Sequence, residues 1–186
     1  MKKWLFNPFI YVAGGKALII GLVVMAATAI FGYFSNTHFD GVLDAHTGAI
    51  TPIGYYFAEQ LINWLCMVLV IFAAGRIFSR SAIRLIDVAG TLALARWPTA
   101  IAALAGFGIQ IPVTRIPEKL LESLTPPMIL CMLVSMVFMI WMVALYYNAY
   151  RTSCNMKDGK SVGIFIATLL IAEILSKIIY SLFLYQ

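Results

Sequence analysis

The sequence predicts an all-α membrane protein whose single domain crosses the bilayer five times. Two features of the composition support this prediction. Of all residues, 62% are hydrophobic and only 11% are charged, which leaves too little polar surface for a soluble globular protein. The third observation is that the apolar residues are concentrated in five long blocks separated by short polar links. A mean hydropathy of +0.93 agrees with this fold class.

Each apolar block is long enough to be a transmembrane helix, since a helix of about 20 residues crosses the ~30 Å hydrocarbon core. The blocks are too long and too continuously apolar for barrel strands, which alternate over roughly ten residues. Backbone groups in lipid also need partners within their own helix. The predicted spans are residues 17–34, 53–75, 85–108, 128–149 and 162–184 of one domain that covers residues 1–186.

The basic residues of the links predict the orientation of the bundle. Nine precede the first span or lie in the second-to-third and fourth-to-fifth links, whereas the other links hold two. Because basic links stay in the cytoplasm, we expect a cytoplasmic N-terminus and a C-terminus on the far side. Nucleic-acid binding is not expected, since it needs a basic face on a folded surface. The nine are Lys2, Lys3, Lys16, Arg76, Arg80, Arg84, Arg151, Lys157 and Lys160, and the two are Arg115 and Lys119.

Two short segments outside the spans are predicted to lie on the membrane surface. Residues 4–12 carry four aromatic residues next to the first span, and such residues favour the membrane interface. Residues 117–124 begin with a proline, which suits the first position of a helix, and they place leucines and charged residues on different faces. For this second segment, an ordinary amphipathic linker explains the pattern equally well.

Four charged residues lie deep inside predicted spans, where an unpaired charge is costly. A rise of 1.5 Å per residue places Arg96 about 18 Å from the basic links and Glu173 about 20 Å from them, near the depth of Asn63. Glu59 and Lys177 lie deeper, at about 25 Å. We therefore expect two polar layers, one with Arg96, Glu173 and Asn63 and the other with Glu59 and Lys177. Glu173 and Lys177 are also favourably spaced i,i+4 neighbours.

Two interpretations of this charged network stay open. The first is a buried polar clamp that fixes the register of the helices, and two acids balanced by two bases favour it. The second is a proton or ion relay, or an anion site around Arg96, because intramembrane charges often mark transport pathways. Pro98 also predicts a kink close to Arg96. A solvated cavity that reached the network would favour transport, whereas a dry, paired cluster would favour a clamp.

The link between the first two spans holds a cluster of metal-binding side chains. Within nine residues it contains two imidazoles and two carboxylates, from His38, Asp40, Asp44 and His46. These ligand types suit zinc or manganese, but their spacing matches no standard site and Asp-Gly is a typical turn dipeptide. A solvated polar loop is the preferred interpretation. No cofactor other than this divalent metal is considered.

A stripe of methionines follows one face of the fourth span. Its members are Met128, Met132, Met136 and Met139, spaced at helical intervals. Thioether ligands favour Cu(I). Methionine also fills irregular apolar packing, and packing is the preferred interpretation.

No catalytic signature accompanies these features. The sequence has no HExxH motif, no glycine-rich phosphate loop and no Ser/His/Asp order of the kind that hydrolases use. Cys66 and Cys131 lie within spans and Cys154 lies in a basic link, so they suggest neither a disulfide framework nor a redox pair. We therefore expect that the protein is not an enzyme.

Three short motifs lie in or next to the first three spans. They are Asn7-Pro8-Phe9 before the first span, Phe39-Asp-Gly-Val-Leu-Asp44 after it, and Arg96-Trp97-Pro98 in the third span, which follows a basic link. Together with the five-span topology, these motifs resemble the Yip family, the Ypt/Rab-interacting membrane proteins, in its short bacterial form. The resemblance covers about residues 5–184 and implies a multi-pass protein of a bacterial inner membrane.

The resemblance also implies a non-enzymatic protein that acts through helix and lipid contacts. Membrane lipids are the expected partners, together with a second copy of the chain if it dimerises. Eukaryotic members belong to secretory membranes and bind small GTPases. This sequence lacks their long cytosolic N-terminal region and its Asp-Leu-Tyr-Gly-Pro motif, so GTPase binding does not carry over. A small transporter or channel that uses the charged network for an ion, a proton or a metal is the alternative hypothesis.

Overall fold

The computed structural model describes residues 2–109, 124–156 and 159–183. Within these ranges, five helical segments are long and apolar enough to cross a membrane. They correspond to the five predicted blocks, so the prediction of an all-α polytopic membrane fold is confirmed. The segments are α2 (Gly14–Ser35), α3 (Ile53–Phe78), α4 with α5 and η2 (Leu85–Gly108), α6 (Pro126–Ser153) and α7 (Ser161–Phe183).

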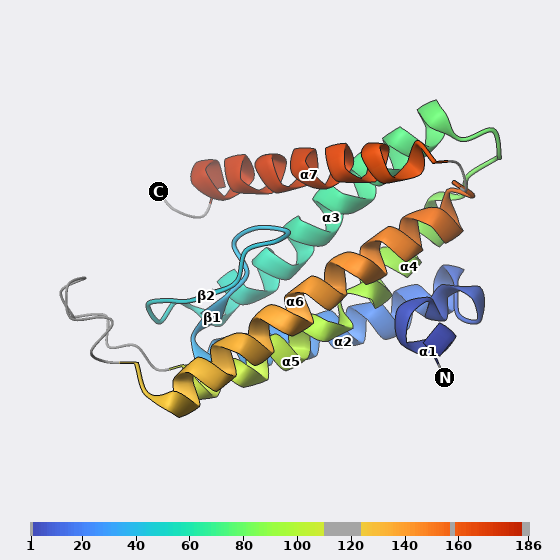
Figure 1. Cartoon of the computed structure of the whole chain (residues 1–186). Helices are drawn as coiled ribbons and strands as arrows, with labels where there is room; N and C mark the ends of the chain where they lie inside the picture. The colour runs from blue at the N-terminus through green and yellow to red at the C-terminus, as the bar shows by residue number, and fades with distance from the viewer. Residues whose placement is uncertain (1, 110–123, 157–158, 184–186) are drawn as a thin grey trace.

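The helices form a bundle with two different ends (Figure 1). α7 packs mainly on α3, α6 packs on α4 and α5, and α2 contacts α3, α4 and α5. The N-terminus lies at one end with residues 79–84 and 154–156, and we call this the basic end. Residues 36–52, which connect α2 to α3, lie at the opposite end, which we call the loop end. α6 and α7 diverge toward the loop end (Figure 1).

The third membrane segment is interrupted at Arg96. α4 covers Leu85–Ala95, α5 covers Trp97–Ala105, and a short 3-10 turn, η2, covers Gly106–Gly108. Pro98 lies in the first turn of α5, where its missing backbone N–H breaks the helical hydrogen-bond pattern. The break agrees with the predicted kink. Because this segment is the most buried of the five, the Arg96 side chain begins at the centre of the bundle.

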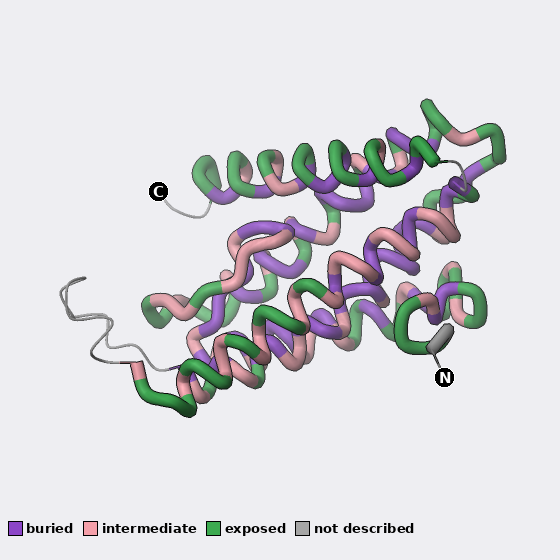
Figure 2. The backbone as a smooth tube through the Cα atoms, viewed as in Figure 1, coloured by how far each residue is buried: buried purple, intermediate pink, exposed green. Residues whose placement is uncertain are grey.

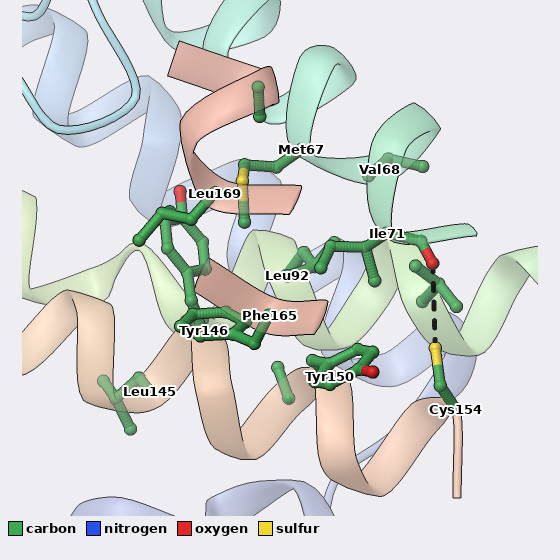
Figure 3. Close-up of a cluster of buried hydrophobic side chains, with 14 of the residues drawn as sticks. Met67, Val68, Ile71, Leu92, Leu145, Tyr146, Tyr150, Cys154, Phe165 and Leu169 are labelled. Carbon is green, nitrogen blue, oxygen red and sulfur yellow. Dashed lines mark hydrogen bonds between the residues drawn. The ribbon is translucent and has the colours of Figure 1, made fainter. Parts of the chain in front are cut away.

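An apolar core joins the helices on the basic-end side of this break (Figure 3). Ile71 of α3, Leu92 of α4, Tyr150 of α6 and Phe165 of α7 are among its buried members. The α2 and α4 backbones approach closely, since a side chain added at Gly90 would clash with the Gly14 carbonyl oxygen. Small residues permit such close packing in lipid, where burial of apolar surface between helices gives no net gain.

The outward faces of the helices are exposed and apolar (Figure 2). On α7, the side chains of Leu170, Ile174 and Ile178 are between 49% and 60% exposed. Phe165 and Tyr180 on the inner face of the same helix are buried. In a bilayer, the exposed apolar face lies against lipid.

The N-terminal segment lies against α6. It consists of α1 (Lys2–Phe6) and a 3-10 turn, η1 (Pro8–Ile10). Phe9 is buried, Trp4 is 57% exposed, and the Trp141 indole of α6 donates a hydrogen bond to the Leu5 carbonyl oxygen at 3.1 Å. The membrane-surface location of residues 4–12 stays a prediction. The other predicted surface segment, residues 117–124, lies outside the described residues apart from its last member.

Candidate functional site: a polar loop inside the bundle

Residues 36–52 fold back into the loop end of the bundle instead of extending away from it (Figures 1 and 2). Asn36 has a left-handed backbone with φ 55°, a conformation that asparagine tolerates, and it turns the chain at the end of α2. β1 (Thr37–His38) then pairs antiparallel with β2 (His46–Thr47). Phe39 packs on α5 and contacts Met139 of α6. The loop therefore occupies the space where α6 and α7 diverge.

Glu59 of α3 holds the first part of the loop, and we call its contacts the buried anchor. Its Oε1 lies 2.7 Å from Nδ1 of His38, and its Oε2 accepts a hydrogen bond from the Phe39 backbone N–H at 2.8 Å. Asn63, one turn further along α3, donates to the Phe39 carbonyl oxygen at 2.6 Å. The Tyr180 hydroxyl of α7 donates to the Glu59 carbonyl oxygen at 2.9 Å. Glu59 is only 1% exposed, so this anchor is enclosed by protein.

The surroundings of His38 favour its protonated form. Nδ1 faces the Glu59 carboxylate, and Nε2 lies 3.0 Å from the Ala49 carbonyl oxygen, so a doubly protonated ring can donate both hydrogen bonds. The Tyr56 ring stacks on the imidazole at a centroid distance of 4.5 Å. Burial opposes the charged form, but the hydrogen bond and charge of Glu59 outweigh burial, and the pKa of His38 is raised above 6.5.

Glu173 and Lys177 of α7 hold the second part of the loop, and we call their contacts the rim anchor. Glu173 Oε2 accepts a hydrogen bond from the Leu43 backbone N–H at 2.8 Å. Lys177 Nζ lies 2.6 Å from Asp44 Oδ2 and 3.6 Å from Glu173 Oε1. A side chain at Gly41 would come within 2.5 Å of Glu173 Oε1, so a larger residue there would push the Glu173 carboxylate out of its present position. The Lys177 side chain is 46% exposed, which distinguishes this anchor from the buried one.

Arg96 does not pair with Glu173, and this corrects the predicted polar layers. Its guanidinium donates to Gln60 Oε1 at 2.7 Å and to the Tyr146 hydroxyl at 2.9 Å. No carboxylate of the described residues forms an ion pair with it. The prediction failed because depth along a helix fixes the height of a side chain but not its direction.

Glu59 was expected to pair with Lys177, and this pairing is also corrected. Glu59 binds His38 of the loop, while Lys177 binds Asp44. The predicted i,i+4 neighbourhood of Glu173 and Lys177 is present at 3.6 Å. The loop explains this correction, because it enters the bundle and supplies the partners of Glu59, Glu173 and Lys177.

Three polar residues of the site were not singled out from the sequence. Gln60 and Tyr146 bind Arg96, and Tyr180 reaches the buried anchor. The available signals were weak: a glutamine adjoins Glu59, and two tyrosines place a hydroxyl within otherwise apolar spans. Tyrosine is common at such positions for packing alone, so the pattern does not identify its hydrogen-bonding role.

The predicted metal cluster is assembled only in part. Ligand atoms of Asp40, Asp44 and His46 lie within 4.8 Å of one another, whereas His38 belongs to the buried anchor. His46 Nδ1 lies 3.3 Å from Asp40 Oδ1, and this pairing raises the pKa of His46 and lowers that of Asp40. Two carboxylates and one imidazole suit zinc or manganese. A metal ion would have to compete with Lys177 for Asp44 and with His46 for Asp40.

A pocket of about 450 Å³ lies beside the rim anchor, between the loop and α6. Asp44 and His46 are part of its lining on the loop, and Met132, Met136 and Met139 are part of it on α6. The loop cluster and the methionine stripe, which are separate features of the sequence, therefore meet at one pocket. Its volume falls within the range of small-ligand sites.

Comparison with known proteins gives one match. The family model of the Yip1 domain matches residues 2–179, a range that includes both anchors, the break at Arg96 and nearly all of the five membrane segments. No curated protein and no solved structure matches the chain.

Proposed function

We propose, since this chain belongs to the Yip1 domain family, that it is a non-enzymatic protein which organises membranes through helix and lipid contacts. It is an integral, multi-pass membrane protein, as its five apolar helices and its family both indicate. Lipids are the proposed main partners, and a second copy of the chain is a further proposed partner. Binding of small GTPases is not part of the proposal.

The observation that carries this proposal is the burial and hydrogen bonding of the charged groups inside the bundle. Glu59 is bound by His38 and by the Phe39 backbone, and Arg96 is bound by Gln60 and Tyr146. A transport pathway needs charged groups that face water, whereas Glu59 and Arg96 are each 1% exposed. These contacts support the clamp interpretation, in which the charges fix the loop and the helices relative to one another.

The proposal includes an orientation and a location. The basic links support a cytoplasmic basic end and a loop end on the far side of the membrane. The resemblance to short bacterial members supports the inner membrane of a bacterium. Cysteine-accessibility labelling of single-cysteine variants in intact cells, with the new cysteine at Arg80 or at Ile50, tests the orientation. Labelling at position 80 from outside the cell would reverse it.

A transporter is the second candidate function, and one observation favours it. The pocket of about 450 Å³ lies beside Asp44 and His46, and the Lys177 side chain is half-exposed. An ion or a small solute could therefore reach the rim anchor from the loop end. Neither Glu59 nor Arg96 lines this pocket.

Solute flux through the purified protein distinguishes the two functions. We propose reconstitution into liposomes that contain indicators for protons, potassium or zinc, with protein-free liposomes and a Glu173→Gln variant as controls. The membrane-organising proposal predicts no flux above that of the protein-free liposomes. Robust flux through the wild-type protein that Glu173→Gln abolishes would overturn it and establish the transporter.

A further inference from the structure

A polar pocket of about 390 Å³ lies at the basic end, between the N-terminal segment and the last turns of α6. Five of its six lining residues are polar, and one of them is an arginine. They are Asn7, Ile10, Asn148, Arg151, Thr152 and Asn155. Neither anchor of the loop end contributes to this pocket, so it is a separate candidate site.

The pocket is held in shape by contacts between segments that are distant in the sequence. The Thr152 hydroxyl donates to Asn7 Oδ1 at 3.3 Å, which joins α6 to the N-terminal segment and fixes the Asn7 side-chain amide. The Asn155 side-chain amide donates to the Ser81 hydroxyl at 2.8 Å. Phe9 is 1% exposed and secures the N-terminal segment against the bundle.

Arg151 supplies a positive charge that no described carboxylate neutralises. Its Nε donates to the Met156 carbonyl oxygen at 3.2 Å, and its guanidinium lies over the Tyr147 ring at 5.7 Å. These contacts orient the guanidinium but leave its two terminal NH₂ groups without a bonded acceptor among the described residues, and no described carboxylate forms an ion pair with it. Two parallel N–H donors of arginine match two oxygens of a phosphate.

The residues around the pocket are of the kinds that favour the level of lipid headgroups. The exposed rings of Trp4 and Tyr11 stack at a centroid distance of 4.8 Å on the same N-terminal segment, and exposed Trp and Tyr favour the membrane interface. Ile10, which is 51% exposed, gives the pocket one apolar wall. Exposed basic residues elsewhere at this end, such as Arg76 and Arg84, attract anionic lipids.

We propose that this pocket binds the phosphate of an anionic membrane phospholipid, with Arg151 as the main ligand and the Asn7 side-chain NH₂ as a second donor. Because Asn7 accepts from Thr152 through its oxygen, its NH₂ group stays available for the ligand. The inference rests on the proposed function in so far as it names one lipid contact of the bundle. It assigns lipid recognition to the end of the protein opposite the loop.

Binding of short-chain lipid to the protein in detergent tests this site. The probes are dihexanoyl phosphatidylglycerol, glycerol 3-phosphate and inorganic phosphate, each titrated by calorimetry against wild type and variants. We expect phosphatidylglycerol to bind and Arg151→Gln to weaken that binding about tenfold or more, as for loss of a hydrogen bond to a charged group. Arg76→Gln, which removes an exposed charge of the same end outside the pocket, should change binding less than about twofold.

Two further variants separate a ligand role from a structural one. Asn7→Asp keeps the oxygen that Thr152 needs but introduces a negative charge, and we expect a loss of binding similar to that of Arg151→Gln. Arg151→Lys keeps the charge without the paired donors and should restore part of the binding. Asn7→Asp still reports on the site if Arg151→Gln fails to fold.

Equal phosphatidylglycerol binding by wild type, Arg151→Gln and Asn7→Asp would overturn the site. Equal Arg151-dependent binding of inorganic phosphate and of the lipid would overturn the assignment to lipid. Solute flux is measured in a separate liposome experiment. Lipid binding can therefore be interpreted even if flux contradicts the proposed function, and an absence of lipid binding does not alter the flux result.

Discussion

At the loop end, Glu59 and Glu173 hold residues 38–43 through hydrogen bonds and an ion pair. At the basic end, Ile71, Tyr150 and Phe165 pack in an apolar core with small residues at the helix crossings. Both ends have specific hydrogen bonds, but among the described residues only the loop end fixes a connection between helices with buried charged groups. In lipid, apolar contacts alone specify helix pairs weakly, so the polar loop is the part of the molecule that defines a unique arrangement.

The two ends also differ in how their charged groups are used. The loop end carries acids that are used internally, with Asp44 and Glu173 shared by Lys177. The basic end carries a cation, Arg151, that is oriented by a carbonyl oxygen and a tyrosine ring and forms no ion pair with a described carboxylate. Arg96 is enclosed in the bundle and bound by helix side chains, which indicates a structural task, whereas Arg151 lines a pocket and is placed to bind a ligand from outside the chain. We therefore assign architecture to the loop end and lipid recognition to the basic end.

The largest effect is expected when the buried anchor is broken. Glu59→Gln keeps the size of the side chain but leaves protonated His38 buried without its counter-ion, and we expect a loss of about 3 kcal/mol in the free energy of unfolding. Chemical unfolding in detergent micelles measures it. Asp44→Asn at the half-exposed rim anchor is the matched control, with an expected loss of less than about 1 kcal/mol. Equal losses would contradict the distinction between the two anchors.

Two tyrosines one turn apart on α6 test the difference between polar and apolar contacts. The Tyr146 hydroxyl accepts from Arg96, whereas the buried Tyr150 hydroxyl has no hydrogen-bond partner among the residues that the structure describes. Tyr146→Phe should therefore cost about 1–3 kcal/mol, and Tyr150→Phe should be neutral or slightly stabilising. The same unfolding measurement compares them. A larger loss for Tyr150→Phe would show that the apolar core depends on a polar contact.

The pH dependence of stability gives a smaller effect that should come from the loop end. The pKa of His38 is raised in the folded protein, so its stabilising contribution is fully present below pH 6.5 and is lost as the pH rises through the folded pKa. Unfolding curves between about pH 5 and 9 should show stability falling with pH. His38→Gln should flatten this decline more than His46→Gln does. The His46 side chain, which pairs with Asp40, is much more exposed than the His38 side chain. An unchanged slope in His38→Gln would exclude the buried anchor as its source.

Metal binding at the loop is expected to have the smallest effect. Lys177 occupies Asp44 and His46 pairs with Asp40, so zinc or manganese should bind weakly and stabilise little, following mass action. Thermal-shift titration of wild type and of the His38→Ala/His46→Ala variant should give equal shifts for each metal. A shift confined to wild type, and lost below about pH 6 as histidine protonates, would establish a metal site there.

Much of the fold could be predicted from the sequence, because lipid imposes one simple requirement on length and polarity. The five blocks predicted five membrane helices, and Pro98 predicted the break beside Arg96. The single family match agrees with the resemblance carried by the motifs around Phe9, Phe39 and Arg96. These features are local, so each can be recognised without knowing what lies across the bundle.

The partners of the charged residues could not be predicted in the same way. Depth estimates grouped Arg96 with Glu173, but pairing also depends on which way each helix is turned and on where the connecting loop goes. A loop with His38 and Asp40 has the composition of a solvated link, and the sequence does not indicate that Glu59 and Glu173 would bind its backbone. Such contacts join residues 20 and 130 positions apart, a separation that local patterns do not report.

The rim anchor also sets an order of events during synthesis. Leu43 and Asp44 contact α7 residues that follow them by 130 and 133 positions. At about 5–20 residues per second, the ribosome makes those partners roughly 7 to 27 seconds after the loop. During that interval the loop can be held by Glu59 and Asn63 and by the packing of Phe39, but Leu43 and Asp44 have no partners on α7 until the last helix enters the membrane. The last helix therefore supplies the final contacts of the loop between α2 and α3. A chain whose synthesis stops before α7 would keep this loop only partly bound, and we expect it to be more sensitive to proteases.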